Sequence, residues 1–218
     1  MRPTPHLDAL AVVILLTGHL LAQTATDASP TSPADTTVKP WSFSLTTYGY
    51  IVPHDRSYAS PTFTADHERL HLEARYNYEN QETGSLWIGY NLSVGDKLLL
   101  EAIPMIGVVF GNTNGIAPGY KFSLTYKRFD LSTEGEYVFD TKERAGSSFY
   151  SWNELTYSPR DWFRAGLVSQ RTRAYHTELD VQRGLLVGFS YKKVDFTTYI
   201  FNAGWTDPTV VLALGFKF

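Results

Sequence analysis

Large apolar residues occupy every second position over the last ten residues of the chain. A period of two predicts a β-strand, because successive side chains of a strand point to opposite faces. The strand predicted over 209–218 ends on an aromatic residue. The apolar face of this strand would carry Val210, Leu212, Leu214, Phe216 and Phe218.

The same alternation recurs upstream, and no stretch has sustained helical periodicity. We therefore expect an all-β domain built from about twelve strands. Pro61 removes a donor from the second strand, so it should lie at an edge or bulge; without that strand the count falls to ten or eleven. The predicted strands cover 41–52, 57–65, 69–78, 85–94, 98–110, 119–128, 131–139, 148–157, 162–171, 182–191, 195–203 and 209–218.

The connections between these strands alternate in length. Longer linkers are predicted at 111–118, 140–147 and 172–181. An even number of strands returns both ends of the sheet to the side that carries the short turns. The tight turns are predicted at 66–68, 95–97, 129–130, 158–161 and 193–194.

The amino terminus has a different character. Arg2 precedes an apolar run over 9–21, and Ala22 offers a small residue for cleavage, so 1–22 reads as a signal peptide. An anchor helix is the alternative, but the run is shorter than the ~20 residues that a spanning helix needs. Residues 23–40 are rich in Thr, Ala, Ser, Asp and Pro and are predicted to be a disordered periplasmic linker. The domain then covers 41–218.

Composition excludes several classes of function. The chain has no Cys, so it can form neither a disulfide nor a thiolate metal site. A net charge of −3 without a basic stripe or a phosphate-binding glycine motif argues against nucleic-acid binding. We expect no cofactor and no metal.

The closing strand that ends at Phe218, the exported amino terminus and the alternation of short and long connections resemble bacterial outer-membrane β-barrels. The resemblance implies a closed antiparallel up-and-down transmembrane β-barrel in the outer membrane of a Gram-negative-type bacterium. Its implied partners are outer-membrane lipid and the insertion machinery, which would engage the C-terminal strand. A secreted or periplasmic β-sandwich or a lipocalin-like barrel is the alternative.

The polarity of the two faces decides between these architectures. In the third predicted strand one face carries apolar and aromatic side chains and the other carries polar and charged ones. The first face has Leu70, Leu72, Ala74, Tyr76 and Tyr78, and the second has Arg69, His71, Glu73, Arg75 and Asn77. A soluble barrel would have to pack its apolar faces inward, although the chain contains 14 Tyr, 13 Phe and 5 Trp. Aromatic girdles facing lipid are the more economical placement, so we expect apolar side chains outside and ionic ones inside.

Twelve-stranded members of the class include passive channels, a phospholipase and autotransporter translocators. The barrel covers nearly all of the mature chain, which leaves no passenger domain. Ser151 and Asn153 share a predicted outward face, but no His accompanies them, so a hydrolase triad of the phospholipase type cannot be assembled. The resemblance therefore favours a narrow, charge-lined passive channel for small hydrophilic solutes.

The expected pore-lining residues are the inward charges of the predicted strands. Hairpin geometry predicts that Lys127 lies near Glu134 and that Glu154 lies near Arg164. The signs nearly balance, which predicts weak charge preference, and the lumen of such a barrel fits an open pore or a plugged one equally. The set is Arg69, Glu73 and Arg75, considered first because they share one strand, with Glu101, Lys121, Lys127, Glu134, Glu136, Glu154 and Arg164.

Two other functions fit the sequence. A barrel hydrolase with an active site at the rim could use His54 and Asp55 in one loop, and His176, Glu178 and Asp180 at another. Their spacing matches no metal motif. A non-conducting barrel that supports the envelope is the other alternative.

Overall fold

The computed structural model describes residues 40–52, 56–142, 146–174, 180–204 and 208–218. The predicted signal peptide (1–22) lies outside these ranges, as does the predicted linker except for Pro40. No helix in the described part of the chain is long and apolar enough to cross a membrane. The unit formed by Val38–Phe218 is built almost wholly of antiparallel strands.

Thirteen strand segments in the described residues follow one another around a single sheet. Neighbours in sequence are neighbours in the sheet, so the topology is up-and-down. The segments are β1 (Ser42–Ile51), β2 (Tyr58–His67), β3 (Leu70–Tyr76), β4 (Thr83–Tyr90), β5 (Leu92–Val94), β6 (Leu98–Gly111), β7 (Gly115–Tyr126), β8 (Phe129–Asp140), β9 (Ser148–Arg160), β10 (Phe163–Ala174), β11 (Asp180–Tyr191), β12 (Val194–Phe201) and β13 (Thr209–Lys217).

β4 and β5 are two pieces of one strand, because both pair with β6. Their ladders with β6 stop at Met105 and resume at Ala102, so the break lies opposite Pro104. Proline has no N–H to donate, which accounts for the interruption. Asn91, between the two pieces, bonds instead to the Arg69 carbonyl at 2.8 Å. Twelve strands therefore surround the barrel, which confirms the predicted count.

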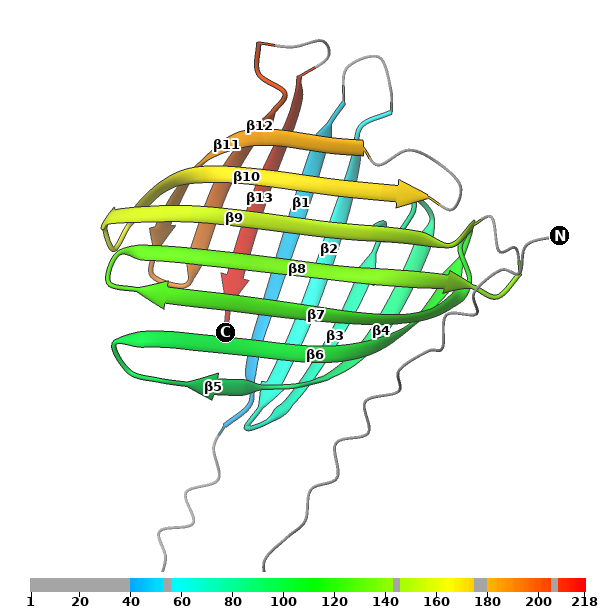
Figure 1. Cartoon of the computed structure of the whole chain (residues 1–218), viewed down its shortest axis with the longest axis horizontal. Helices are drawn as coiled ribbons and strands as arrows, with labels where there is room; N and C mark the ends of the chain where they lie inside the picture. Colours follow the sequence, from blue (N-terminus) through cyan, green and yellow to red (C-terminus); the bar gives the residue numbers. More distant parts are fainter. Residues whose placement is uncertain (1–39, 53–55, 143–145, 175–179, 205–207) are drawn as a thin grey trace, which may run out of the picture. The chain divides into compact units, whose positions relative to one another are not determined.

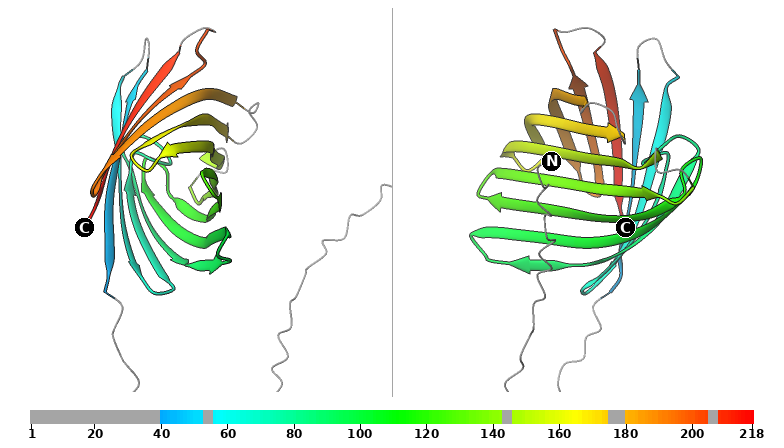
Figure 2. Two further views of the ribbon diagram at one scale, coloured as in Figure 1. Left: turned by 90° about the vertical axis from the view of Figure 1, so that its left-hand side faces the viewer. Right: turned by 45° about the vertical axis from the view of Figure 1, so that its right-hand side comes forward.

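The sheet closes on itself, because β1 pairs with β13 while β4 pairs with β6. Figure 1 shows β6–β10 running across the near side, with β1–β4, β12 and β13 forming the far side. Strongly curved strands, β10 and β11 among them, carry the wall from one side to the other (Figure 2). Closure removes every sheet edge that lipid would otherwise leave without hydrogen bonds.

Two-residue turns lie at one end of the barrel, together with the first residues of β1 and the end of β13. We call this the turn end and the opposite end the loop end. Glu68, Lys127 and Lys192 begin such turns with φ of 52°, 56° and 55°. The turns at 68–69, 127–128, 161–162 and 192–193 lie one to three residues away from their predicted positions, and the loop predicted at 111–118 shrinks to 112–114.

The predicted second strand exists, and its proline is accommodated at a gap in the ladder. Pro61 pairs with Thr47 of β1, but pairing with β3 begins only at Thr62. β3 therefore does not require a donor from the proline.

Apolar side chains cover the outside of the barrel. Leu86 and Ile88 of β4 are each 54% exposed, whereas Trp87 between them is 3% exposed. The same alternation holds for Leu212 and Val211 in β13, so the predicted polarity of the two faces is confirmed. Exposed aromatic residues gather near the turn end, where Phe129 contacts Tyr157 with ring centroids 4.9 Å apart. Such a band is typical of the girdle at a membrane interface.

Gly107 leaves space for Trp87, which lies directly across the β4–β6 ladder. A Cβ at Gly107 would overlap the indole ring, whereas a Cβ at Gly49 would meet only the Leu212 carbonyl, at 3.7 Å. Gly107→Ala should therefore lower the free energy of unfolding by about 1–3 kcal/mol, in the usual range for overpacking. Gly49→Ala is the matched control; equal urea midpoints for the two variants would contradict this packing.

Candidate functional site

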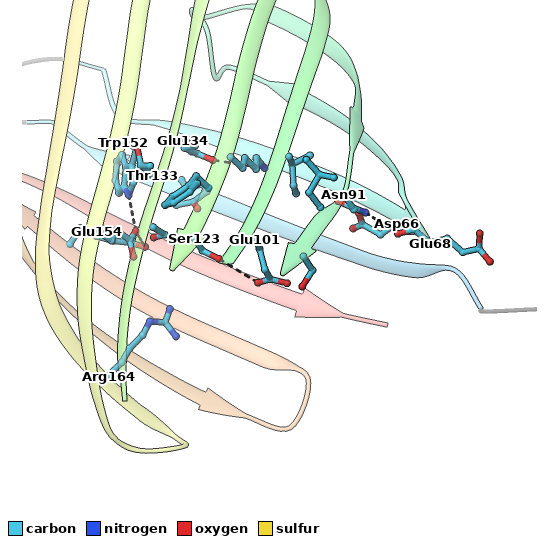
Figure 3. Close-up of a pocket in the computed structure, with 18 residues that line it drawn as sticks. Asp66, Glu68, Asn91, Glu101, Ser123, Thr133, Glu134, Trp152, Glu154 and Arg164 are labelled. Carbon is cyan, nitrogen blue, oxygen red and sulfur yellow. Dashed lines mark hydrogen bonds and ion pairs between the residues drawn. The ribbon is translucent and has the colours of Figure 1, made fainter. Parts of the chain in front are cut away.

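The barrel interior contains a polar cavity of about 790 Å³ at the turn end. Figure 3 shows carboxylates and one guanidinium arranged around it, from β2, β6, β8, β9 and β10. Glu68 stands at its rim in the β2–β3 turn. The charged lining residues among those described are Asp66, Glu68, Glu101, Glu134, Glu154, Lys121 and Arg164.

On the loop-end side of this cavity, a series of buried ion pairs crosses the lumen. We call His71, Glu73, Arg75, Lys121 and Glu136 the central ionic cluster. Arg75 donates through Nε to Glu73 at 2.5 Å and through a terminal nitrogen to Glu136 at 2.6 Å. Lys121 Nζ lies 2.6 Å from Glu73 Oε2 and 3.8 Å from Glu134 Oε2. His71 bridges Asp66 at 2.7 Å and Glu73 at 3.0 Å.

Alternation along β3 produces this cluster. His71, Glu73 and Arg75 occupy every second position, so all three point inward from one strand, and they are only 3%, 4% and 6% exposed. Their partners come from β7 and β8, across the lumen. Charges this deeply buried need paired partners, and each carboxylate–cation contact here meets that requirement.

Aromatic rings join the central ionic cluster in a single layer of side chains across the lumen, which we call the layer. The Arg75 guanidinium lies 4.2 Å from the Tyr78 ring centroid and 4.5 Å from that of Trp87. Tyr78 donates its hydroxyl to Glu134 and meets Tyr150 edge-on, with centroids 5.4 Å apart. Cation–π contacts hold a guanidinium in place and leave its N–H groups free for carboxylates. The layer thus separates the turn-end cavity from the space above it.

That space is a second cavity, of about 300 Å³, at the loop end. Tyr50, Tyr58 and Tyr150 form much of its wall, and Glu79 and Glu136 are its charged lining residues among those described. Tyr50 and Tyr58 stack with centroids 4.6 Å apart. The barrel therefore has a polar hollow at each end and one layer of side chains between them.

Two further groups fix the wall of the turn-end cavity. Glu154 accepts hydrogen bonds from Trp152 Nε1 at 2.7 Å and from the Tyr199 hydroxyl at 2.9 Å. Arg164 makes a bidentate contact with Asp195, at 2.6 and 2.7 Å. Bidentate pairs fix orientation as well as charge.

Part of the lumen is filled by apolar side chains. Inward residues of β9–β13 form one cluster that includes Trp152, Leu186 and Phe201, and Trp87, Met105 and Val138 belong to another. The expectation that aromatic residues serve as lipid-facing girdles therefore holds only for some of them. Twelve strands enclose more volume than the ionic groups occupy, so large inward side chains narrow the passage.

Arg69 and Lys127 were expected inward and lie elsewhere. Arg69 stands in the β2–β3 turn, bonds the Tyr90 hydroxyl at 2.5 Å and lies 5.6 Å from that ring. Lys127 stands in the β7–β8 turn, 5.2 Å from the Tyr126 ring centroid. Both tyrosines are exposed on the outer face. Turn residues do not follow strand alternation, which explains both corrections.

The other eight predicted residues border the lumen: Glu101, Lys121, Glu134, Glu154 and Arg164 at the turn-end cavity, Glu73 and Arg75 in the layer, and Glu136 in the layer and at the loop-end cavity. The predicted pairs changed. Lys121, rather than Lys127, lies near Glu134. Arg164 does line the turn-end cavity together with Glu154, as predicted, but its direct ion pair is with Asp195.

The proposed rim hydrolase depends largely on residues that the structure does not describe, namely His54, Asp55, His176 and Glu178. Among the described residues no group of three or more His, Asp or Glu side chains is arranged to hold a metal ion. Asn153 bonds Thr133 at 2.7 Å, and no described hydrogen bond joins it or Ser151 to a His.

Sequence comparison finds no matching family model and no matching curated protein. Comparison of folds does find relatives. The KdgM porin in complex with disordered oligogalacturonate matches with a TM-score of 0.59 and 10% identity, over 80% of this chain and 99% of that one. The NanC porin matches with a TM-score of 0.58 and 9% identity, over 79% and 98%. The chain shares the barrel fold of these two porins.

Within this barrel, sequence reasoning missed several lumen groups. Asp195 follows the alternation of its strand and could have been found by extending the rule used for β3. Glu79 lies in the short β3–β4 connection, where no periodicity assigns a direction to a side chain. Alternation along the predicted strand 69–78 placed Tyr78 outward, which is wrong: β3 ends at Tyr76, so Tyr78 lies in the connection and contacts Arg75 in the lumen.

Proposed function

We propose that this chain is a narrow outer-membrane channel for small hydrophilic solutes. One observation supports it above the others: a polar cavity enters the barrel from each end, and only the layer that contains Arg75, Tyr78 and Glu134 separates the two. The fold relatives named above are porins, which agrees with the proposal.

The proposed location is the outer membrane of a Gram-negative-type bacterium. The exposed apolar wall suits lipid, and the turn end would face the periplasm, as short turns do in outer-membrane barrels. The predicted signal peptide would direct export. Phe218 pairs with Phe43 through two backbone hydrogen bonds, of 3.0 and 3.2 Å, and we propose that this C-terminal strand engages the insertion machinery.

The proposed pore-lining residues act in two ways. Glu101 and Lys121 face the open turn-end cavity, where they would meet a passing solute. Arg75, Glu73 and Glu136 are held in the layer and set its width. Fixed charges beside a narrow aqueous path select solutes by size and sign.

Conductance in planar bilayers tests this function. Wild-type protein should show small, discrete conductance steps. Tyr78→Ala should increase the step size by at least about twofold, because it removes a ring between the two cavities and widens the narrowest section. Tyr157→Ala is the matched control, since Tyr157 is exposed on the outer face.

Two results would contradict the proposal. Folded wild-type protein that yields no conductance steps, together with Tyr78→Ala protein that also yields none, would show that the lumen does not conduct. Equal increases for Tyr78→Ala and Tyr157→Ala would show that Tyr78 does not border the narrowest section.

A further inference from the structure

We propose that the lumen selects cationic solutes, in particular those with an ammonium or guanidinium group. This inference rests on the proposed channel function and names its solute class. Along the two cavities and the layer between them, the described residues include eight carboxylates and three permanent cations, Arg75, Lys121 and Arg164. The carboxylates are Asp66, Glu68, Glu73, Glu79, Glu101, Glu134, Glu136 and Glu154. An adjoining pocket at the turn end shares Arg164 with the larger cavity and adds Lys192, Lys193, Lys217 and Asp195, so among the described residues nine carboxylates outnumber six permanent cations.

This excess differs from the balance expected from the sequence. The expected set counted Arg69 and Lys127 as inward cations, and both lie over outer tyrosines. Asp66, Glu68 and Glu79 were not counted, and all three border the cavities. Every one of these five corrections moves the lumen toward negative charge.

The ion pairs do not remove the excess. Arg75 is shared by three carboxylates, since Glu79 Oε1 lies 3.7 Å from a guanidinium nitrogen that also bonds Glu136. Lys121 is shared by Glu73 and Glu134. Two cations thus serve four carboxylates in and beside the layer. A passing cation would relieve the remaining negative charge, and an anion would add to it.

Two carboxylate oxygens beside the loop-end cavity lack a hydrogen-bond donor among the described residues. Glu79 Oε1 accepts from Ser85 Oγ at 2.5 Å and from Trp87 Nε1 at 3.3 Å, but Glu79 Oε2 has no hydrogen-bond partner among the described residues. Glu136 Oε1 has none either. Both side chains are at least nine-tenths buried, at 0% and 4% exposure. Buried carboxylate oxygens are normally paired, so these two would gain from a donor.

The walls of this cavity suit an organic cation better than a bare metal ion. Tyr50, Tyr58 and Tyr150 line it, and aromatic faces attract ammonium and guanidinium groups. Arg75 illustrates the chemistry within the protein, because its guanidinium already lies against Tyr78 and Trp87 while it bonds Glu136. A solute cation entering from the loop end would meet the same combination of rings and carboxylates.

Reversal potentials across a KCl gradient test the inference. Wild-type channels should favour K⁺ over Cl⁻ by about tenfold, since clefts lined by one sign of charge concentrate counter-ions to that degree or more. Glu79→Gln combined with Glu136→Gln should reduce the permeability ratio by at least about threefold. Glu82→Gln is the matched control, because Glu82 is an exposed neighbour at the same end and does not line the loop-end cavity.

A second pair of variants changes charges that face the turn-end cavity, and Glu101→Gln leaves the central ionic cluster intact. Glu101→Gln should lower the permeability ratio, because Glu101 is exposed to the turn-end cavity. Lys121→Met should raise it, whereas Lys127→Met should leave it unchanged, since Lys127 lies outside the lumen. The same gradient in ethylammonium chloride should also reverse at a potential that indicates cation preference.

The outcomes separate this inference from the channel function. Conductance without cation preference, or an anion preference, would overturn the inference and leave the channel intact. A preference for K⁺ with exclusion of ethylammonium would overturn the assignment to organic cations. The absence of any conductance would overturn the channel function itself.

Discussion

Replacing Arg75 by methionine is expected to lower the free energy of unfolding by about 3–5 kcal/mol, the usual cost of removing one partner from a buried ion pair. The change leaves Glu73 and Glu136 without their closest guanidinium contacts, at 2.5 and 2.6 Å, and it also removes the cation from between Tyr78 and Trp87. Urea unfolding in detergent micelles, followed by tryptophan fluorescence, measures the effect, because Trp87 adjoins the altered side chain.

Lys127→Met is the control for that variant. It removes one positive charge from a turn on the outer surface, where substitutions usually change stability by no more than about 0.5 kcal/mol. Equal unfolding free energies for Arg75→Met and wild type would show that the central ionic cluster does not hold the lumen together. If the double variant Arg75→Met/Glu136→Gln regains the wild-type free energy of unfolding, the cost of Arg75→Met arises from the unpaired Glu136 carboxylate.

Leu212→Arg should lower the unfolding free energy by about 2–4 kcal/mol in lipid, as expected for a guanidinium on the outer face near the bilayer midplane. Leu212 lies in the middle of β13, is 36% exposed and alternates with the buried Val211 and Ala213. Refolding into lipid vesicles and equilibrium unfolding with guanidinium chloride provide the measurement.

Depth dependence supplies the control for Leu212→Arg. Leu98 is 51% exposed on the same outer face but stands at the turn end, as the first residue of β6. Leu98→Arg should therefore cost only about 0–1 kcal/mol, because the cost falls toward the interfaces. Similar costs at both positions would contradict a bilayer centred on the middle of the strands.

The barrel could be predicted from the sequence because inward and outward side chains alternate along each strand. In β3, alternation alone placed His71, Glu73 and Arg75 inward and Leu72 outward, and burial confirms all four. A strand with one apolar face specifies its register strongly, since a shift of one residue would exchange the two faces. The break between β4 and β5 could not be predicted, because it depends on Pro104 of β6 lying opposite, and the sequence alone does not show that pairing.

The sequence indicated most of the charged residues of the candidate site but not which of them pair with one another. Ion pairs across a lumen join residues of distant strands, such as Arg75 and Glu136, and hairpin geometry reaches only adjacent strands. Turn residues have directions set by local backbone, so Arg69 and Lys127 were misplaced. Glu79, in a short connection, contributes to the lumen although no period indicates it.

The pairing of β1 with β13 determines how late in folding the first strand can gain its second neighbour. On one side β1 pairs with β2, but on the other side Ser44 pairs with Lys217, so that edge of β1 stays unpaired until nearly the whole chain has been synthesised. Until then that edge can template pairing with other chains. Contacts so distant along the sequence form slowly, so this edge of β1 stays unpaired for longer than the edges that hairpins join.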